Sequence, residues 1–267
     1  MNFAEKTVGD LCFGYVPELG AIHGFSTRMG GVSQGVYASL NLGLSLGDER
    51  GNVQENYRRF CAAVGVDKEK LVFSGQEHGP LLRCCTLADA GNGLLRPVDY
   101  QADGLITDVP GLALTIFTAD CLPILLSDPV RKVVAAVHAG WRGTASGIAA
   151  KAVGCMRTIY GCNPKDIRVA IGPGISKCCF ETHEDVPNHM TESMCALPLP
   201  YIEVCEAGKF HVDLKGLNAA DLEQNGVLPE HIAISPDCTA CMPEKYWSHR
   251  VTRGERGSMA AVIALEG

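Results

Sequence analysis

Two histidines and one cysteine in this chain have the residue types of a zinc site. His78 lies in SGQEHG, Cys121 in FTADCLP and His138 in VHAGW, each beside small residues at an expected strand end or turn. Imidazole and thiolate are ligands that Zn²⁺ prefers, and three protein ligands leave the fourth tetrahedral position open for chemistry. Such distant spacing is no metal signature. Both histidines could equally be ordinary turn residues, with the cysteine packed in the core.

Residues next to Cys121 and His138 could bind an anion or move a proton. The segment HAGWRG (138–143) precedes an expected helix, and Arg142 could converge with the free N–H groups of its first turn on a phosphate. Trp141 could stack on a planar ring, or bury its own ring against the helix start. Asp120 could act as an acid or base, or serve only as a turn residue before Cys-Leu-Pro.

A second candidate anion site is the glycine-rich segment STRMGGVSQG (26–35). The hydroxyls of Ser26 and Thr27 and the guanidinium of Arg28 could contact a phosphate, and the glycines would allow backbone N–H groups to approach it. The segment could instead be a glycine-rich loop that carries a solvated arginine. Arg28 and Arg142 are therefore the two candidates for binding a phosphate.

The 13 cysteines indicate a reducing environment. Their number is odd and they include the adjacent pairs 84–85 and 178–179, which suits free thiols better than a disulfide framework. CTAC (238–241) is a Cys-x-x-Cys motif without a second copy or a thioredoxin-like context, so we expect Cys238 and Cys241 to be structural.

Composition and charge restrict the class of protein. A net charge of −7 argues against a general nucleic-acid binder, which needs a basic face. No apolar run is long enough for a membrane span, and MNFAEKTVGD is no signal peptide, so we expect a cytoplasmic protein. The hydrophobic fraction of 46% and the lack of a linker-like stretch predict one globular domain over 1–267.

The elements that must position these residues alternate between helices and strands. Apolar spacing predicts helices over 52–64, 144–161 and 210–226, the second capped by Thr144 or Ser146 and ended by Gly161. Extended chain is expected from 71 to 79, three strands between 102 and 138, and further strands over 167–172, 231–235 and 258–265. This order predicts an α/β protein with mixed strand pairing.

Six blocks, in order along nearly the whole chain, resemble the laccase-domain or "polyphenol oxidase" family, also called YfiH-type. They are STRMGGVSQGVYASLNLGLSLGD (26–48), SGQEHG (74–79), ADGLITDVPGLALTIFTADCLPILLSD (102–128), AAVHAGWRGTASGI (135–148), AIGPGISKCCFE (170–181) and DCTACMPEKYWSHR (237–250). The resemblance implies a single-domain α-β-β-α four-layer sandwich, with zinc held by His78, Cys121 and His138. It also implies phosphorolysis of adenosine, inosine, guanosine and methylthioadenosine, and deamination of adenosine, with a purine nucleoside and phosphate as partners.

Two positions depart from the family pattern, and several functions compete with this one. Trp247 stands where phenylalanine is usual, and Glu77 replaces a β-branched residue beside His78, where it could alter access or bonding around the metal. A copper-dependent polyphenol oxidase would need paired His-x-His segments, which the eight histidines do not form. The chain could also be a metal-free hydrolase using Cys121 with His138 as base, or a non-catalytic zinc or redox-sensing protein. For deamination, Asp120 is the expected proton carrier.

Overall fold

The central strand β9 (Val133–Ala139) shows how the sequence builds the fold. All seven of its residues are buried in the computed structural model, which describes residues 1–267. Val133, Ala135 and Val137 belong to one core cluster, and Val134 and Ala136 belong to another. A strand that is covered on both faces has a continuous apolar sequence rather than an alternation of apolar and polar residues.

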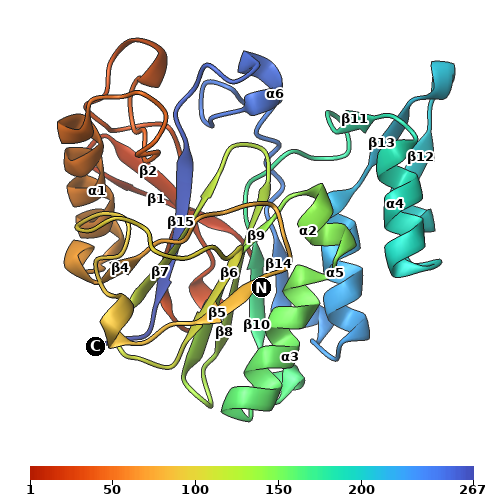
Figure 1. Cartoon of the computed structure of the whole chain (residues 1–267), viewed down its shortest axis with the longest axis horizontal. Helices are drawn as coiled ribbons and strands as arrows, with labels where there is room; N and C mark the ends of the chain where they lie inside the picture. The colour runs from red at the N-terminus through yellow and green to blue at the C-terminus, as the bar shows by residue number, and fades with distance from the viewer.

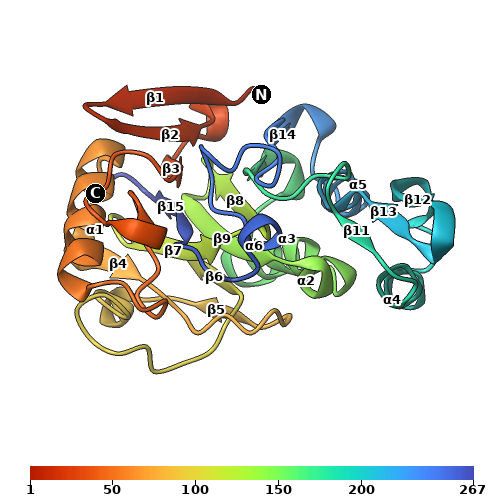
Figure 2. The same cartoon turned by 90° about the horizontal axis from the view of Figure 1, so that it is seen from above.

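Two six-stranded sheets pack face to face (Figures 1 and 2). The first has the order β1 (Ala4–Val8), β2 (Leu11–Tyr15), β3 (Ile22–Ser26), β15 (Met259–Ala264), β7 (Ala113–Thr118) and β4 (Leu71–Val72). The second has the order β14 (Ile232–Ile234), β10 (Arg168–Ile171), β8 (Leu122–Asp128), β9, β6 (Gly104–Thr107) and β5 (Leu82–Cys84). Each sheet combines antiparallel and parallel pairs, so the expected mixed pairing is confirmed.

Helices cover the outer face of each sheet. On the first sheet, α1 (Arg50–Val64) buries Val53, Tyr57 and Phe60 against residues of β15 and β4. On the second, α2 (Trp141–Ala145), α3 (Ile148–Tyr160) and α5 (Leu214–Gln224) pack over β9 and its neighbours (Figure 1). The layers are therefore helix, sheet, sheet and helix, as the family resemblance implied.

A small third sheet lies at one end of the molecule, beside the helices of the second sheet (Figure 2). It consists of β11 (Glu181–Thr182), β13 (Phe210–Val212) and β12 (Ile202–Val204), and α4 (Asp185–Met194) lies next to it. The short helix α6 (His249–Thr252) leads into β15. No helix has both the length and the apolar character needed to cross a bilayer.

Several predicted elements have different limits in the structure. The segment 102–138 contains four strands instead of three, because β6 and β7 are separate strands that lie in different sheets. The predicted helix 144–161 is two helices, since Gly147 adopts a left-handed φ of 65° between them, and neither Thr144 nor Ser146 caps the second. The helix expected from residue 210 begins at Leu214, after β13 and the capping side chain of Asp213.

Candidate metal centre

The three predicted ligands meet at one end of the sandwich. The register of β8 and β9 pairs Leu122 with Ala139, so Cys121 lies beside the end of β9 that carries His138. His78 comes from the turn after β4, and its ring centroid lies 4.8 Å from that of His138 at an angle of 78°. Their potential ligand atoms all lie within 4.8 Å of one another. His138 is buried and His78 is exposed, so the group reaches the surface on one side.

Asp103, immediately before β6, organises two of these residues. Its Oδ1 accepts hydrogen bonds from the backbone N–H of His78 at 2.9 Å and from Nδ1 of His138 at 2.8 Å. Its Oδ2 accepts the backbone N–H groups of Glu77 and Gly79 at 3.1 and 2.8 Å. The carboxylate is 2% exposed, so one buried group orients the imidazole of His138 and fixes the turn that carries His78. Sequence reasoning missed this residue.

The electrostatics favour a thiolate at the centre. Burial alone would raise the pKa of the Cys121 thiol, but its interactions with His138 and His78 lower that pKa to about 6. Burial opposes protonation of His138, yet the hydrogen bond to Asp103 and the contact with Cys121 raise the pKa of the imidazole to about 9. The same hydrogen bond lowers the pKa of Asp103 against the effect of burial. Both shifts favour the charged forms, a thiolate at Cys121 and a protonated imidazole at His138.

These residues fit a divalent metal ion. Because Nδ1 of His138 is bonded to Asp103, its Nε2 is the nitrogen left for a metal, the carboxylate–histidine–metal arrangement that orients metal-binding imidazoles. A thiolate and two imidazoles are a zinc ligand set with one open position. A single thiolate with two imidazoles is also found in copper sites, so the donors alone do not select the metal.

Asp120 lies next to the centre, but its carboxylate is fully engaged. It accepts hydrogen bonds from Thr239 Oγ1 at 2.6 Å, Ser248 Oγ at 3.1 Å and the backbone N–H of Arg250 at 2.7 Å. Its backbone has a φ of 88°, an uncommon value for a residue with a side chain. These contacts hold the loop before α6 against the turn that presents Cys121. Asp120 also lines a cavity beside that cysteine, and its role as proton carrier stays a prediction.

The first three residues of the glycine-rich segment 26–35 make hydrogen bonds within the protein. Arg28 donates hydrogen bonds to the carbonyls of Ala38 and Pro243, and its guanidinium lies 3.8 Å from the centroid of the Trp247 ring. Ser26 is buried and accepts the N–H of a β15 residue, and the Thr27 hydroxyl donates to a β2 carbonyl. None of the three lines a cavity at the centre. A role of Ser26, Thr27 and Arg28 in binding phosphate stays a prediction from the sequence.

Two cavities share His78 and Cys121 among their lining residues. The first has a volume of about 530 Å³ and is lined by Phe73, Phe117 and Leu44 together with His78, Cys121 and His138. The second, of about 370 Å³, is lined by Trp141, Phe180 and Ile175 as well as His78 and Cys121. Ligand pockets commonly measure about 300 to 1,000 Å³. Both cavities therefore have the size of a small-molecule site, and they meet at the candidate metal centre.

Trp141 and Arg142 differ in their relation to these cavities. Trp141 lines the second cavity, with its ring edge-on to His189 at a centroid distance of 5.6 Å. Arg142 is exposed and lies over the Trp141 ring, outside the lining of both cavities. Glu77 lines neither cavity. Trp141 therefore lies at the second cavity, whereas the guanidinium of Arg142 packs on the Trp141 ring outside it.

Cationic residues near the C-terminus complete the site, and sequence reasoning missed them. Arg256 lines both cavities, and His249 and Arg250 line the second. The Nε of Arg256 is buried without a hydrogen-bond partner, while its Nη1 donates to the Gly257 carbonyl. Burial lowers the pKa of this guanidinium. A buried donor without a partner is costly, so Arg256 is suited to bind an anion there.

Comparison with known proteins places the chain in a family. A model of the family described as multi-copper polyphenol oxidoreductase laccase matches residues 22–266. The chain belongs to this family. Over 264 residues it is 39% identical to a protein of Geobacillus stearothermophilus named purine nucleoside phosphorylase YlmD, in a match that covers 98% of this chain and 96% of the relative.

Solved structures of the laccase family share the fold. The crystal structure of YlmD from Geobacillus stearothermophilus superposes with a TM-score of 0.91 at 36% identity, over 98% of both chains. That of the Bacillus licheniformis hypothetical protein YfiH gives a TM-score of 0.93 at 32% identity, over 98% of this chain and 99% of the other. The family resemblance and the α/β architecture expected from the sequence are therefore confirmed.

Proposed function

We propose that this chain is a metal-dependent purine nucleoside phosphorylase with Zn²⁺ bound by His78, Cys121 and His138. The observation that carries the proposal is the meeting of these three side chains at the junction of two cavities of ligand size. The Geobacillus stearothermophilus relative, which matches almost the whole chain, is named a purine nucleoside phosphorylase, and this name supports the same reaction class here.

The first cavity suits the nucleoside. Phe73 and Phe117 lie edge-on with ring centroids 4.9 Å apart, and they line this cavity together with Leu44, Leu46 and Val98. Flat apolar and aromatic surfaces of this kind bind a purine ring by burial and stacking. The ribose would then lie toward the metal ligands and Arg256, which line the same cavity.

Arg256 is the residue that we assign to phosphate. It borders both cavities, so an anion bound by its unpaired Nε lies between the nucleoside and the second cavity. Guanidinium groups bind phosphate oxygens through charge-assisted hydrogen bonds. His249 and Arg250 add positive or hydrogen-bonding groups on the side of the second cavity. Arg142, which lies outside both linings, stays a prediction from the sequence for the same role.

The chain's own residues supply orientation and charge to phosphorolysis. Phosphate must be held against C1′ of the ribose while the sugar becomes cationic and the purine leaves. A phosphate on Arg256 would place negative charge near that carbon, and Asp103 keeps the His138 ring in place. When bound, the divalent ion would supply Lewis-acid chemistry at the open coordination position.

The proposed substrates are adenosine, inosine, guanosine and methylthioadenosine, with deamination of adenosine as a further activity. Deamination requires a group that moves a proton at C6 of adenine. Asp120, which lines the second cavity beside Cys121, is the candidate for this role, with its carboxylate held in place by three donors. Hypoxanthine or inosine among the products would reveal this second reaction, whereas phosphorolysis alone gives adenine.

The test combines metal content with product analysis. Purified protein is assayed for zinc by mass, then incubated with adenosine and phosphate while adenine, hypoxanthine and inosine are measured. His78→Ala should lose the zinc of this centre and the activity. A metal-free protein whose Cys121 is readily alkylated would favour the Cys–His hydrolase. Bound zinc without turnover of any nucleoside would favour a binding or sensing protein.

The phosphate assignment has its own test. Arg256→Ala removes a charge-assisted contact of about 1.5 to 3 kcal/mol, so the KM for phosphate should rise about 10- to 100-fold while zinc is retained. Arg253→Ala is the matched control, because Arg253 is exposed in the same loop and lines neither cavity. An unchanged phosphate KM in Arg256→Ala, with a rise in Arg142→Ala, would transfer the role to Arg142.

A further inference from the structure

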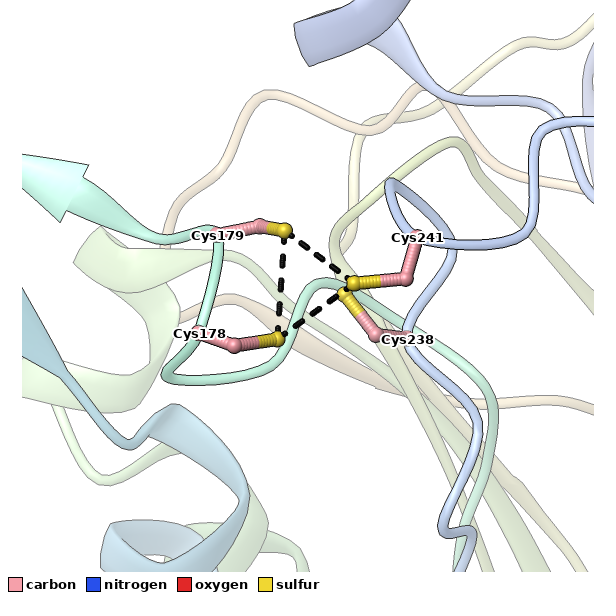
Figure 3. Close-up of side chains that lie close together, drawn as sticks. All are labelled: Cys178, Cys179, Cys238 and Cys241. Atoms are coloured by element: carbon pink, nitrogen blue, oxygen red, sulfur yellow. Dashed lines mark hydrogen bonds between the residues drawn. The ribbon is translucent and has the colours of Figure 1, made fainter.

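Four cysteine thiols gather away from the candidate metal centre. Cys178 and Cys179 lie in the loop between β10 and β11, and Cys238 and Cys241 lie in the loop between β14 and α6. Figure 3 shows the four sulfur atoms pointing toward one another from these two loops. All four Sγ atoms lie within 4.8 Å of one another. None of the four residues lines either cavity at the candidate metal centre.

We propose that these four cysteines form a second, structural Zn²⁺ site. With Zn–S bonds of about 2.3 Å, the sulfur atoms at the corners of a tetrahedron lie about 3.8 Å apart. The Sγ separations are 3.8 Å for Cys178 and Cys179, 3.6 Å for Cys178 and Cys241, and 3.3 Å for Cys179 and Cys241. The sulfurs of a disulfide would lie about 2.05 Å apart. The cluster is therefore close to the size that a tetrathiolate site requires.

The backbone around Cys238 already has the form of a metal-binding turn. Its carbonyl accepts the N–H groups of Cys241 and Met242 at 3.2 and 3.1 Å, a tight turn that brings the two thiols of CTAC to one side. The backbone N–H of Ser176, from the other loop, donates to Sγ of Cys238 at 3.3 Å. Hydrogen bonds to a ligand atom orient it and tune its metal, so the site is partly formed by the protein alone.

The surroundings can balance the charge of such a site. Four thiolates around one Zn²⁺ carry a net charge of −2. The buried ammonium of Lys215 is held nearby by the carbonyls of Ser235 and Asp237 at 2.9 and 2.7 Å. Burial lowers the pKa of Lys215, and the neighbouring Cys238 and Cys178 oppose this shift. The Arg250 guanidinium donates to the carbonyl of Cys179 at 3.0 Å. Fixed cations beside a cluster of thiols favour its deprotonated, metal-binding form.

Four protein ligands leave no open position, so this site is structural rather than catalytic. It would join two loops that reach the candidate metal centre. The second loop contains Thr239, whose hydroxyl bonds to Asp120, and its N–H donates to Gly174 of the first loop. The sequence predicted a structural role for Cys238 and Cys241 without a partner. The proposed role is zinc binding together with Cys178 and Cys179.

Metal counting tests the proposal. Protein reconstituted with Zn²⁺ and desalted should contain two zinc ions per chain, and Cys178→Ser/Cys241→Ser should contain one. This double variant removes two exposed ligands and leaves the buried Cys238 intact. Cys84→Ser is the matched control, because Cys84 is exposed and lies outside the cluster, and it should keep both ions. His78→Ala should also keep one ion, and the combination of all three substitutions should keep none.

Cobalt provides a readout that does not depend on nucleoside turnover. His78→Ala titrated with Co²⁺ should show the intense sulfur-to-cobalt charge-transfer absorption of a tetrathiolate site, and Cys178→Ser/Cys241→Ser in that background should lose it. A zinc count that Cys178→Ser/Cys241→Ser leaves unchanged, or a disulfide among the four cysteines of protein kept under reducing conditions, would overturn the proposal. One zinc in the wild-type protein that this double variant loses would support the tetrathiolate site and contradict the candidate metal centre instead. Failure of the phosphorylase assay alone would leave these counts unaffected.

Discussion

Replacing Asp103 by asparagine tests how the candidate metal centre is held. In the structure each carboxylate oxygen accepts two hydrogen bonds: Oδ1 from His78 N–H and His138 Nδ1, and Oδ2 from the N–H groups of Glu77 and Gly79. Asparagine has nearly the same shape but only one oxygen. Whichever way the amide is turned, its NH₂ group faces two donors, so two hydrogen bonds are lost and the negative charge disappears.

The expected size of the effect follows from this loss. Removing a group that orients a metal-binding histidine weakens metal affinity about 10- to 100-fold, which corresponds to about 1.4 to 2.7 kcal/mol. Asp103→Asn should therefore bind Zn²⁺ more weakly by that factor. The turn that carries His78 loses its anchor as well, so the thermal midpoint of the metal-free protein should also fall.

The assay is competition for Zn²⁺ against a chromogenic chelator, with circular dichroism as a check on folding. Asp89→Asn is a matched control, because Asp89 is also a buried carboxylate that accepts a backbone N–H and an arginine, but it lines neither cavity at the ligands. That variant should lose stability while it keeps its zinc affinity. A folded Asp103→Asn protein that binds zinc as tightly as the wild type would refute the role assigned to this carboxylate.

Three further outcomes are expected. A Cβ at Gly140 would lie 3.1 Å from Sγ of Cys121 and 3.1 Å from Cδ2 of His78, so Gly140→Ala should weaken zinc binding about tenfold in the same chelator assay. Gly154→Ala is the control and should leave zinc binding unchanged, because a Cβ at Gly154 meets no atom within 4 Å. After zinc is removed, the rate of Cys121 alkylation should stay constant down to a pH of about 6 and fall below it, because the pKa of this thiol is lowered. A pH–rate profile with its midpoint near the pKa of an ordinary thiol would contradict the contacts with the imidazoles. Tyr57→Phe removes a buried hydrogen bond of 2.7 Å to a loop carbonyl and should cost about 1 kcal/mol of unfolding free energy by denaturant titration, with no change in zinc content.

The helices and strands that the sequence predicted correctly have clear local signals. Gly65 and Gly161 end α1 and α3 in left-handed conformations, as the helix patterns indicated. The break at Gly147 was not anticipated, because Thr144 and Ser146 ahead of the apolar stripe offered plausible caps for a single helix. The third sheet was missed since its strands are only two or three residues long, too short for an alternating pattern.

The three candidate ligands could be proposed from their residue types, but the residues that hold them in place could not. Asp103 is a single acidic residue between alanine and glycine, and nothing local shows that its oxygens reach a turn 25 residues earlier. Arg28 has the neighbours of an anion site, yet its guanidinium is occupied by carbonyls from distant segments. The thiols of Cys178 and Cys241 are 63 residues apart, and adjacent cysteines have no recognised metal-binding spacing. In each case the contact partner is distant in the sequence, so local residue patterns cannot predict the contact.

The uneven burial of the three candidate ligands sets the order in which an ion would leave. His138 and Cys121 adjoin a hairpin packed between layers, where side chains cannot swing without disturbing their neighbours. His78 sits on an exposed turn at a positive φ of 62°, tied down mainly by one carboxylate. If an ion binds there, its exchange would need only the few residues of this turn to open, and the packed sheets could stay folded.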